Sequence, residues 1–457
     1  MNNLINLLVQ KTGLKKEHIS NILKLLDEGS TIPFIARYRK EMTGGADDEV
    51  LREFETVYMS SKNLLNRKED ISRLIQEKGV LTEAIKKSIE DAESLHVLED
   101  IYRPFKEKKS SRASTAIENG LTPLADTLQG AKLTKEELLL EAKSFVKKNI
   151  TSIEEALKGA QDILAERYAD LPRERESIRN NMQRHGILEV KKAKSFDEKG
   201  VYANFINHSE KVAYIPSHRY LAIMRGVKEK ELSAKITVDT EYIEENIKQY
   251  KIPRNAASSK EFLFDAYKDG LKRLLLPSIE REVQAELKEK ADISAISVFG
   301  KNLNQLLMTP PVTKRVLLGV DPAFVSGCKL AVIDENGNYL ESAVIYPTQP
   351  RNDYANSKTK VLTLTNKYNI TGVAIGNGTG SRETQEFFAR LNKEENASLS
   401  YTVVSEAGAS VYSASKLAQD EYPKLDVTIR GAISIAQRLR DPMATLVKID
   451  PKSLGIG

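Results

Sequence analysis

The sequence is poor in the features that mark secreted and membrane proteins. It contains one cysteine, Cys328, and no tryptophan. A single cysteine excludes an intramolecular disulfide framework, and in a strand pattern it is expected to be a small packed residue rather than a nucleophile. No apolar run approaches the roughly 18 residues of a membrane span, and the first residues lack a secretory signal. We therefore expect a cytoplasmic protein with no membrane contact.

An excess of one charge sign is also missing. The 69 lysines and arginines face 64 acidic residues, which gives a formal net charge of +5. This value is mild for 457 residues, so it permits a nucleic-acid partner without requiring one. The local clustering of basic residues is therefore more informative than the total. The length itself suggests about three domains.

Helical periodicity dominates the first two thirds of the chain. We expect a helical N-terminal domain over residues 1–200, in which a helix-turn-helix is one possibility, although helix pairs joined by short turns are common. Residues 201–311 are expected to form a mixed, largely helical connecting region. Three runs, 187–190, 211–214 and 232–238, fit either short strands or irregular connections. Pro310 and Pro311 end the helical part, because proline breaks helices.

The periodicity changes after Arg315. Apolar runs predict strands, and longer amphipathic patterns predict helices. The predicted strands are 316–320, 328–334, 339–346, 372–376 and 401–404; the predicted helices are 353–368, one from Ser381, 409–421 and 428–440. Three strands in a meander, followed by alternating helices and strands, predict an α/β ribonuclease-H-like domain over residues 312–445. Residues 446–457 are expected to be a short linker.

Several sequence blocks resemble the Tex family of bacterial transcription accessory proteins. The N-terminal blocks are LDEGSTIPFIARYRKE at 26–41, LEDIYRPFK at 98–106, AQDILAE at 160–166 and IPSHR at 215–219. The C-terminal blocks, GVDP at 319–322, AIGNGT at 374–379, VSEAGASVYSA at 404–414 and DP at 441–442, resemble its YqgF-type ribonuclease-H-like domain. Each block is short, but their joint occurrence in this order is highly specific.

The resemblance implies a helical N-terminal region, a YqgF-type domain and a role in transcription. Family members continue into helix-hairpin-helix modules and an OB-fold RNA-binding domain, so we expect this chain to lack those modules. One departure from the family pattern lies beside Asp321. Ala323 follows the Asp321-Pro322 pair where the family usually has glycine, and this change could shift the turn slightly.

Three carboxylates are candidates for a catalytic metal site. Two-metal phosphodiester hydrolysis needs three or four converging carboxylates, and Asp321, Glu406 and Asp441 are the candidate Mg²⁺ ligands and catalytic groups. The fold would place another carboxylate at the end of the fourth strand, but Asn377 stands there. Alternatively, the three carboxylates cap turns and helices. We therefore expect a vestigial, non-catalytic site without a cofactor; Mg²⁺ is expected only if the site is active.

Basic residues gather in a few segments. Phosphate pairing by such clusters, with aromatic rings nearby for base stacking, is typical of nucleic-acid binding, although a charge run is also typical of a solvated surface. The candidate contacts are Arg37, Arg39, Lys40, Arg103, Lys106, Lys108, Lys109, Arg112, Arg219 and Arg382. Arg382 ends a glycine-rich segment, 376–382, that precedes a helix and fits either a phosphate-binding loop or a plain turn.

These patterns lead to one main hypothesis and two alternatives. The main hypothesis is sequence-tolerant binding of RNA or DNA by a transcription accessory factor that performs no chemistry. The first alternative is an Mg²⁺-dependent ribonuclease-H-like nuclease or resolvase. The second is a protein-interaction scaffold for a partner in the transcription machinery.

Overall fold

The structure, a computed structural model, describes residues 2–106, 110–147, 149–254 and 256–456. Lys108 and Lys109 therefore lie outside the described residues. The chain divides into two units, residues 1–288 and 289–457, and each is described by itself. Among the described residues, no helix is long and apolar enough to cross a membrane.

The first unit begins with a helical cluster. Its helices are α1 (Asn2–Thr12), α2 (Lys16–Asp27), α3 (Ile32–Tyr38) and α4 (Asp48–Glu77). Apolar side chains spaced by three and four residues bury one face of each helix, and Leu8, Ile22 and Ile35 are fully buried. The hydroxyl of Thr31 accepts a hydrogen bond from the Phe34 amide (3.4 Å) and begins α3. This cap fixes the start of the short helix.

The helical region continues through seven more helices. They are α5 (Glu83–Asp91), α6 (Leu95–Tyr102), α7 (Arg112–Glu118), α8 (Thr122–Gly130), α9 (Lys135–Lys143), α10 (Ile153–Ala169) and α11 (Pro172–His185). Helix α10 is the central element, because its buried residues pack against α7, α8 and α9. Pro172 stands in the first turn of α11, where a missing amide hydrogen costs nothing.

Buried ion pairs hold α11 in place. Arg175 is 1% exposed and pairs with Asp100 of α6 and with Glu282. Arg179, one turn later, donates to the same two carboxylates at 2.6 Å and 2.8 Å. Because the side chains of Arg175, Arg179 and Asp100 are all nearly inaccessible to water, each charge depends on its partners.

A small sheet, further helices and the first part of the long helix α15 complete the first unit, which ends at Lys288. Strands β1 (Ile187–Lys192), β2 (Ser209–Lys211) and β3 (Leu232–Thr237) form an antiparallel sheet in the order β2-β1-β3. The runs 187–190 and 232–238 thus form strands, whereas 211–214 is an irregular connection, because β2 ends at Lys211 and Val212–Tyr214 form a 3-10 turn. Helices α12 (Ser217–Lys228), α13 (Thr240–Tyr250) and α14 (Lys260–Asp269) follow. A π-helical segment, Gly270–Leu275, joins α14 to α15 (Leu276–Leu307).

The second unit contains a five-stranded mixed sheet. Its strands are β4 (Leu317–Asp321), β5 (Cys328–Ile333), β6 (Tyr339–Ile345), β7 (Gly372–Gly376) and β8 (Ser400–Val404), in the order β6-β5-β4-β7-β8. Strands β4 and β5 are antiparallel, whereas β4, β7 and β8 are parallel. This topology confirms the predicted ribonuclease-H-like α/β fold, and all five predicted strands are present. The expected packed environment of Cys328 is also confirmed, since the residue is 1% exposed.

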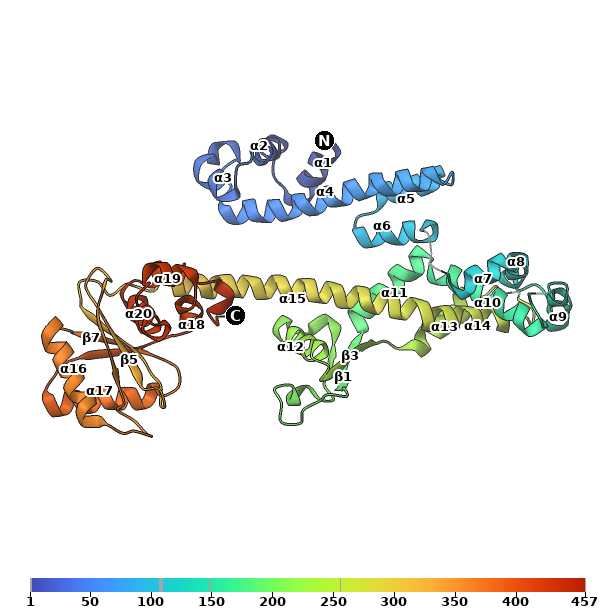
Figure 1. The fold of residues 1–457 in the computed structure, drawn as a ribbon. Helices are drawn as coiled ribbons and strands as arrows, with labels where there is room; N and C mark the ends of the chain where they lie inside the picture. The colour runs from blue at the N-terminus through green and yellow to red at the C-terminus, as the bar shows by residue number, and fades with distance from the viewer. Residues whose placement is uncertain (1, 107–109, 148, 255, 457) are drawn as a thin grey trace. The chain divides into compact units, whose positions relative to one another are not determined.

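Helices cover both faces of this sheet (Figure 1). Helices α16 (Tyr354–Tyr368) and α17 (Ser381–Glu395) pack on one face, against Leu318 and Val320. Helix α20 (Val427–Arg440) packs on the other face, against Leu317. Gly319 permits this contact, because a Cβ there would lie 2.1 Å from the carbonyl oxygen of Ala432. Helix α20 is therefore pressed against the strand that ends at Asp321.

Residues 446–454 do not form a free linker. Helices α18 (Ala409–Ser413), α19 (Lys416–Glu421) and α21 (Pro442–Leu446) precede a final 3-10 turn, Pro451–Ser453. Leu446, Ile449 and Leu454 are buried in one apolar cluster with Tyr412. Because these apolar side chains are buried against Tyr412, the segment is part of the domain. The prediction of a linker over residues 446–457 is therefore wrong for residues 446–454.

Candidate functional site

Two of the three predicted carboxylates come together at one edge of the large sheet. Asp321 is the last residue of β4, and Glu406 follows the end of β8. The parallel pairing of β4, β7 and β8 brings the carboxyl ends of these strands to the same edge. Burial, together with the negative charge of Glu406, raises the pKa of Asp321 to about 6, while Lys329 opposes this shift. The two carboxylates therefore share one poorly hydrated site.

The glycines after β7 make room for Glu406. A Cβ at Gly378 would lie 1.9 Å from Oε1 of Glu406, and one at Gly376 would lie 2.7 Å from Oε2. Between them, Oδ1 of Asn377 accepts a hydrogen bond from the Glu406 amide (3.0 Å). The glycine-rich segment 376–382 thus surrounds a carboxylate, which is an unfavourable neighbour for a phosphate. Its geometry favours the turn over the phosphate-binding loop.

A buried arginine, Arg438, lies near Glu406. Arg438 of α20 is 5% exposed and donates from Nη1 to the carbonyl oxygen of Ala407 (2.8 Å). Burial lowers the pKa of Arg438 to about 10, and the charge of Glu406 opposes this shift. Its Nε and Nη2, like Oε2 of Glu406, are buried without a hydrogen-bond partner among the described residues. The guanidinium group therefore supplies fixed positive charge beside the carboxylate.

Asp441 does not join the other two carboxylates. Its Oδ1 accepts a hydrogen bond from the Ala444 amide (3.0 Å) and caps the N-terminus of α21. No group of three or more histidine, cysteine, aspartate or glutamate side chains arranged to hold a metal occurs in the described part of the chain. The donor set at the sheet edge, two carboxylates with an amide and a guanidinium, does not fit a two-metal centre.

Helix α3 carries the first basic cluster on an exposed aromatic surface. Phe34 is 40% and Tyr38 is 56% exposed, and their ring centroids lie 5.2 Å apart. The Arg37 guanidinium lies 5.8 Å from the Tyr38 ring centroid, and that of Arg39 lies 5.6 Å from the Phe34 centroid. Arg37, Arg39 and Lys40 make no ion pair with any described residue. We call these five side chains the α3 patch.

The other predicted basic residues differ in whether an acidic side chain already pairs with them. Arg103 pairs with Asp170 at 2.8 Å, and Arg219 pairs with Glu210 at 2.7 Å, so both charges are already engaged. Arg382 extends from α17 with 87% of its side chain exposed and lies 3.4 Å from Glu386. Lys106 and Arg112 are exposed and form no ion pair with any described residue.

Sequence reasoning missed two features of these sites. The first is the exposed, tilted ring pair of Phe34 and Tyr38, which was missed because an aromatic pair in a helix is usually interpreted as core. The available signal was the i, i+4 spacing of Phe34 and Tyr38 together with the neighbouring Arg37 and Arg39, which indicates one helix face carrying rings and charge. Arg438 was missed because nothing in the local sequence distinguishes it from Arg440 two residues later.

Three family models match the chain in succession. They describe a Tex-like protein N-terminal domain (residues 2–76), a Tex central region-like domain (135–299) and a Tex protein YqgF-like domain (315–440). The chain belongs to the Tex family. The YqgF-like match coincides with the unit that carries Asp321 and Glu406, and the N-terminal match contains the α3 patch.

Curated relatives of this Tex-family chain extend over nearly all of it. It is 42% identical to the uncharacterized protein YdcI of Bacillus subtilis over 98% of this chain and 63% of that protein. It is 36% identical to the transcriptional accessory protein Tex of Neisseria gonorrhoeae over 100% of this chain and 60% of that protein. A human S1 RNA-binding domain-containing protein 1 is 33% identical over 99% of this chain and 47% of its own length. The chain thus spans about half to two thirds of these relatives.

Proposed function

We propose that this chain is a sequence-tolerant nucleic-acid-binding part of a transcription accessory protein, and that the α3 patch contacts single-stranded RNA or DNA. The observation that carries the proposal is the combination of two exposed, adjacent rings with three basic side chains that lack ion-pair partners among the described residues. Rings of this kind stack on bases, while arginine and lysine pair with phosphates. The names of the Neisseria and human relatives support this direction.

The mechanism of binding follows from the geometry of the α3 patch. The guanidinium groups of Arg37 and Arg39 lie within 5.8 Å and 5.6 Å of the Tyr38 and Phe34 ring centroids, so positive charge and aromatic faces are presented together. A base can stack on this surface because every base has a π face, and no donor or acceptor pattern selects among bases. Lys40 extends the positive charge at the end of the helix. The expected binding is therefore weakly sequence-selective and strongly salt-dependent.

We also propose that the ribonuclease-H-like centre acts as a structural element and performs no phosphodiester cleavage. Hydrolysis with two metals requires several converging carboxylates. Here, Asn377 holds the Glu406 backbone, Asp441 caps α21, and Arg438 places a cation beside Glu406. These roles fix the ends of β7 and β8 and the start of α21.

The α3 patch can be tested by removing its charge. In the double variant Arg37→Gln/Arg39→Gln, affinity for a fluorescein-labelled single-stranded oligonucleotide, measured by anisotropy at low salt, should fall about tenfold. The matched control is Lys86→Gln/Lys87→Gln, which removes the same charge from exposed positions of α5 and should leave the affinity nearly unchanged. Equal losses in both variants would show that only net charge matters and would overturn the assignment of the contact to α3.

A further inference from the structure

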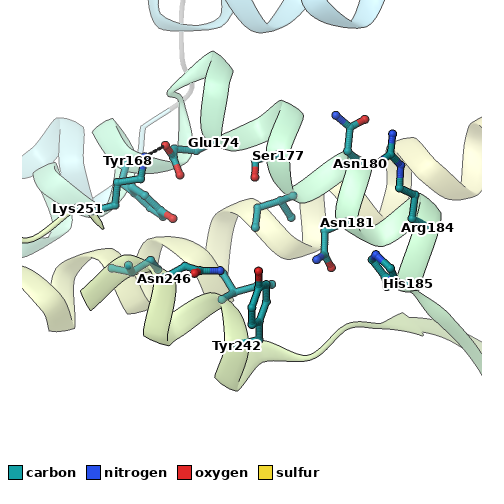
Figure 2. A pocket seen from close by; sticks show the side chains of 13 residues that line it. Tyr168, Glu174, Ser177, Asn180, Asn181, Arg184, His185, Tyr242, Asn246 and Lys251 are labelled. Carbon is teal, nitrogen blue, oxygen red and sulfur yellow. Dashed lines mark hydrogen bonds and ion pairs between the residues drawn. The ribbon is translucent and has the colours of Figure 1, made fainter. Parts of the chain in front are cut away.

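A polar pocket lies between α11 and α13, beside the end of α10 (Figure 2). Its volume is about 270 Å³, which is small for a drug-sized ligand. The apolar part of its lining consists of Ile178, Ile243 and Ile247, each at most 5% exposed. The buried ion pairs of Arg175 and Arg179 hold the opposite face of α11, so this wall of the pocket is preorganised.

At one end of the pocket, the charged and polar side chains pair with one another. Glu174 forms an ion pair with Lys251 and also interacts with the hydroxyl of Tyr168. Burial, with the charge and hydrogen bond of Glu174 added, raises the pKa of Tyr168. Figure 2 shows these three side chains together, away from Tyr242 and His185. This end therefore closes the pocket and offers little unbalanced charge to a ligand.

The other end presents unpaired polar groups. Asn181 and His185 of α11 face Tyr242 of α13 (Figure 2). None of these side chains, nor that of Asn246 between the two ends, makes a hydrogen bond or ion pair with a described residue. Asn181 and Asn246 are half-buried, and Tyr242 is 59% exposed. Both amides reach solvent, so their donors and acceptors are available to a ligand.

These groups match the chemistry of a nucleotide. Each asparagine offers one acceptor and two donors, which can pair with the edge of a nucleobase. The exposed Tyr242 ring can stack on one face of the base. Ile178, Ile243 and Ile247 can contact the remaining apolar surface of the base. Arg184, at the rim and without an ion pair among the described residues, can hold a phosphate. A nucleotide carries the ring, the hydrogen-bonding edge and the anion in one unit, whereas a peptide would have to supply them from separate side chains.

We propose that this pocket binds one nucleotide of a single-stranded nucleic acid, with the base between Tyr242 and the two asparagines and the phosphate at Arg184. The proposal rests on the proposed function, because it adds a second contact for the same ligand. It differs from the α3 patch in its chemistry. The patch offers exposed rings and charge, whereas the pocket offers amides that can select a base edge.

The test is titration of the full chain with nucleoside 5′-monophosphates, followed by NMR or calorimetry. All four ribonucleotides are used, with inorganic phosphate and ribose 5-phosphate as probes that lack the base. At least one mononucleotide should bind, and the probes without a base should bind about tenfold more weakly or not at all. Tyr242→Ala should weaken mononucleotide binding about tenfold. Asn181→Leu, which keeps the size but removes the amide, should weaken it as well.

Helix α13 supplies a matched control. Tyr250 is also exposed, at 67%, but does not line the pocket, so Tyr250→Ala should bind as the unmodified chain does. Absence of mononucleotide binding, or equal losses in both tyrosine variants, would overturn the pocket assignment, as would binding of short peptides in place of nucleotides. The proposed function would survive that outcome if oligonucleotide binding still depended on Arg37 and Arg39. If mononucleotides bind in the pocket but oligonucleotide affinity is the same in Arg37→Gln/Arg39→Gln as in the unmodified chain, the α3 patch is contradicted instead.

Discussion

Replacing Asp100 by alanine is expected to lower the free energy of unfolding of the first unit by about 3–5 kcal/mol. Asp100 is 4% exposed and accepts hydrogen bonds from both Arg175 and Arg179, the latter at 2.6 Å. The variant would leave two buried guanidinium groups with Glu282 as their remaining carboxylate. Burying a charge without a partner costs several kcal/mol, so the loss exceeds that of any surface pair. Urea denaturation followed by circular dichroism measures it.

The control for Asp100 is a surface pair in the same unit. Asp126 pairs with Arg167 at 2.6 Å, but its side chain is 59% exposed. Because solvent screens exposed pairs, Asp126→Ala should cost only about 0–1 kcal/mol. A cost for Asp100→Ala within that same range would contradict the view that buried ion pairs fix α11. It would also remove the argument that one wall of the α11 pocket is preorganised.

The second large effect is a pH-dependent stabilisation by Asp321→Asn. The folded-state pKa of Asp321, about 6, lies above its value in the unfolded chain, so ionisation of this carboxyl opposes folding as the pH rises through 6. Asparagine has a similar shape and cannot ionise. The variant should therefore be more stable at pH 8, by up to about 3 kcal/mol. The gain should shrink below pH 6 and vanish near pH 4, where the aspartate is neutral in the folded chain.

Asp334 provides a control of opposite sign in the same unit. Burial alone would raise the pKa of Asp334. Hydrogen bonds from the Asn338 side chain and from the backbone amides of Asn336 and Asn338 outweigh burial and lower this pKa. Its stabilising contribution is present at neutral pH and is lost as the pH falls through the lowered folded pKa. Asp334→Asn should therefore destabilise the unit at pH 8. A destabilising Asp321→Asn at pH 8 would show that the Asp321 charge serves folding, contrary to the geometry.

The elements that the sequence predicted well are those with strong periodicity. The runs that became β4, β5 and β7 are continuous and apolar because both faces of the sheet are covered, and their ends lie within one residue of the prediction. The sequence also indicated helix α16 within one residue of its observed bounds.

The candidate sites were harder to predict, because their chemistry depends on distant residues. Arg103 and Arg219 are engaged by Asp170 and Glu210, and the pairing of Arg103 spans 67 residues. Asp441 resembles a metal ligand in sequence, yet the first turn of α21 uses its carboxylate as a cap. Local sequence shows a charge but not the partner that neutralises it. Only the tertiary structure separates the free cations of α3 from the paired ones.

The central claim, that the α3 patch pairs with the phosphates of a single strand, is tested most directly by a salt titration. The affinity for a single-stranded oligonucleotide of roughly 16 nucleotides is measured at several salt concentrations. For Arg37→Gln/Arg39→Gln/Lys40→Gln, the slope of log K against log salt should be shallower than that of the unmodified chain by about 2. The Lys86→Gln/Lys87→Gln chain should keep the original slope. An unchanged slope in the triple variant, or no affinity of the unmodified chain at low salt, would contradict the account.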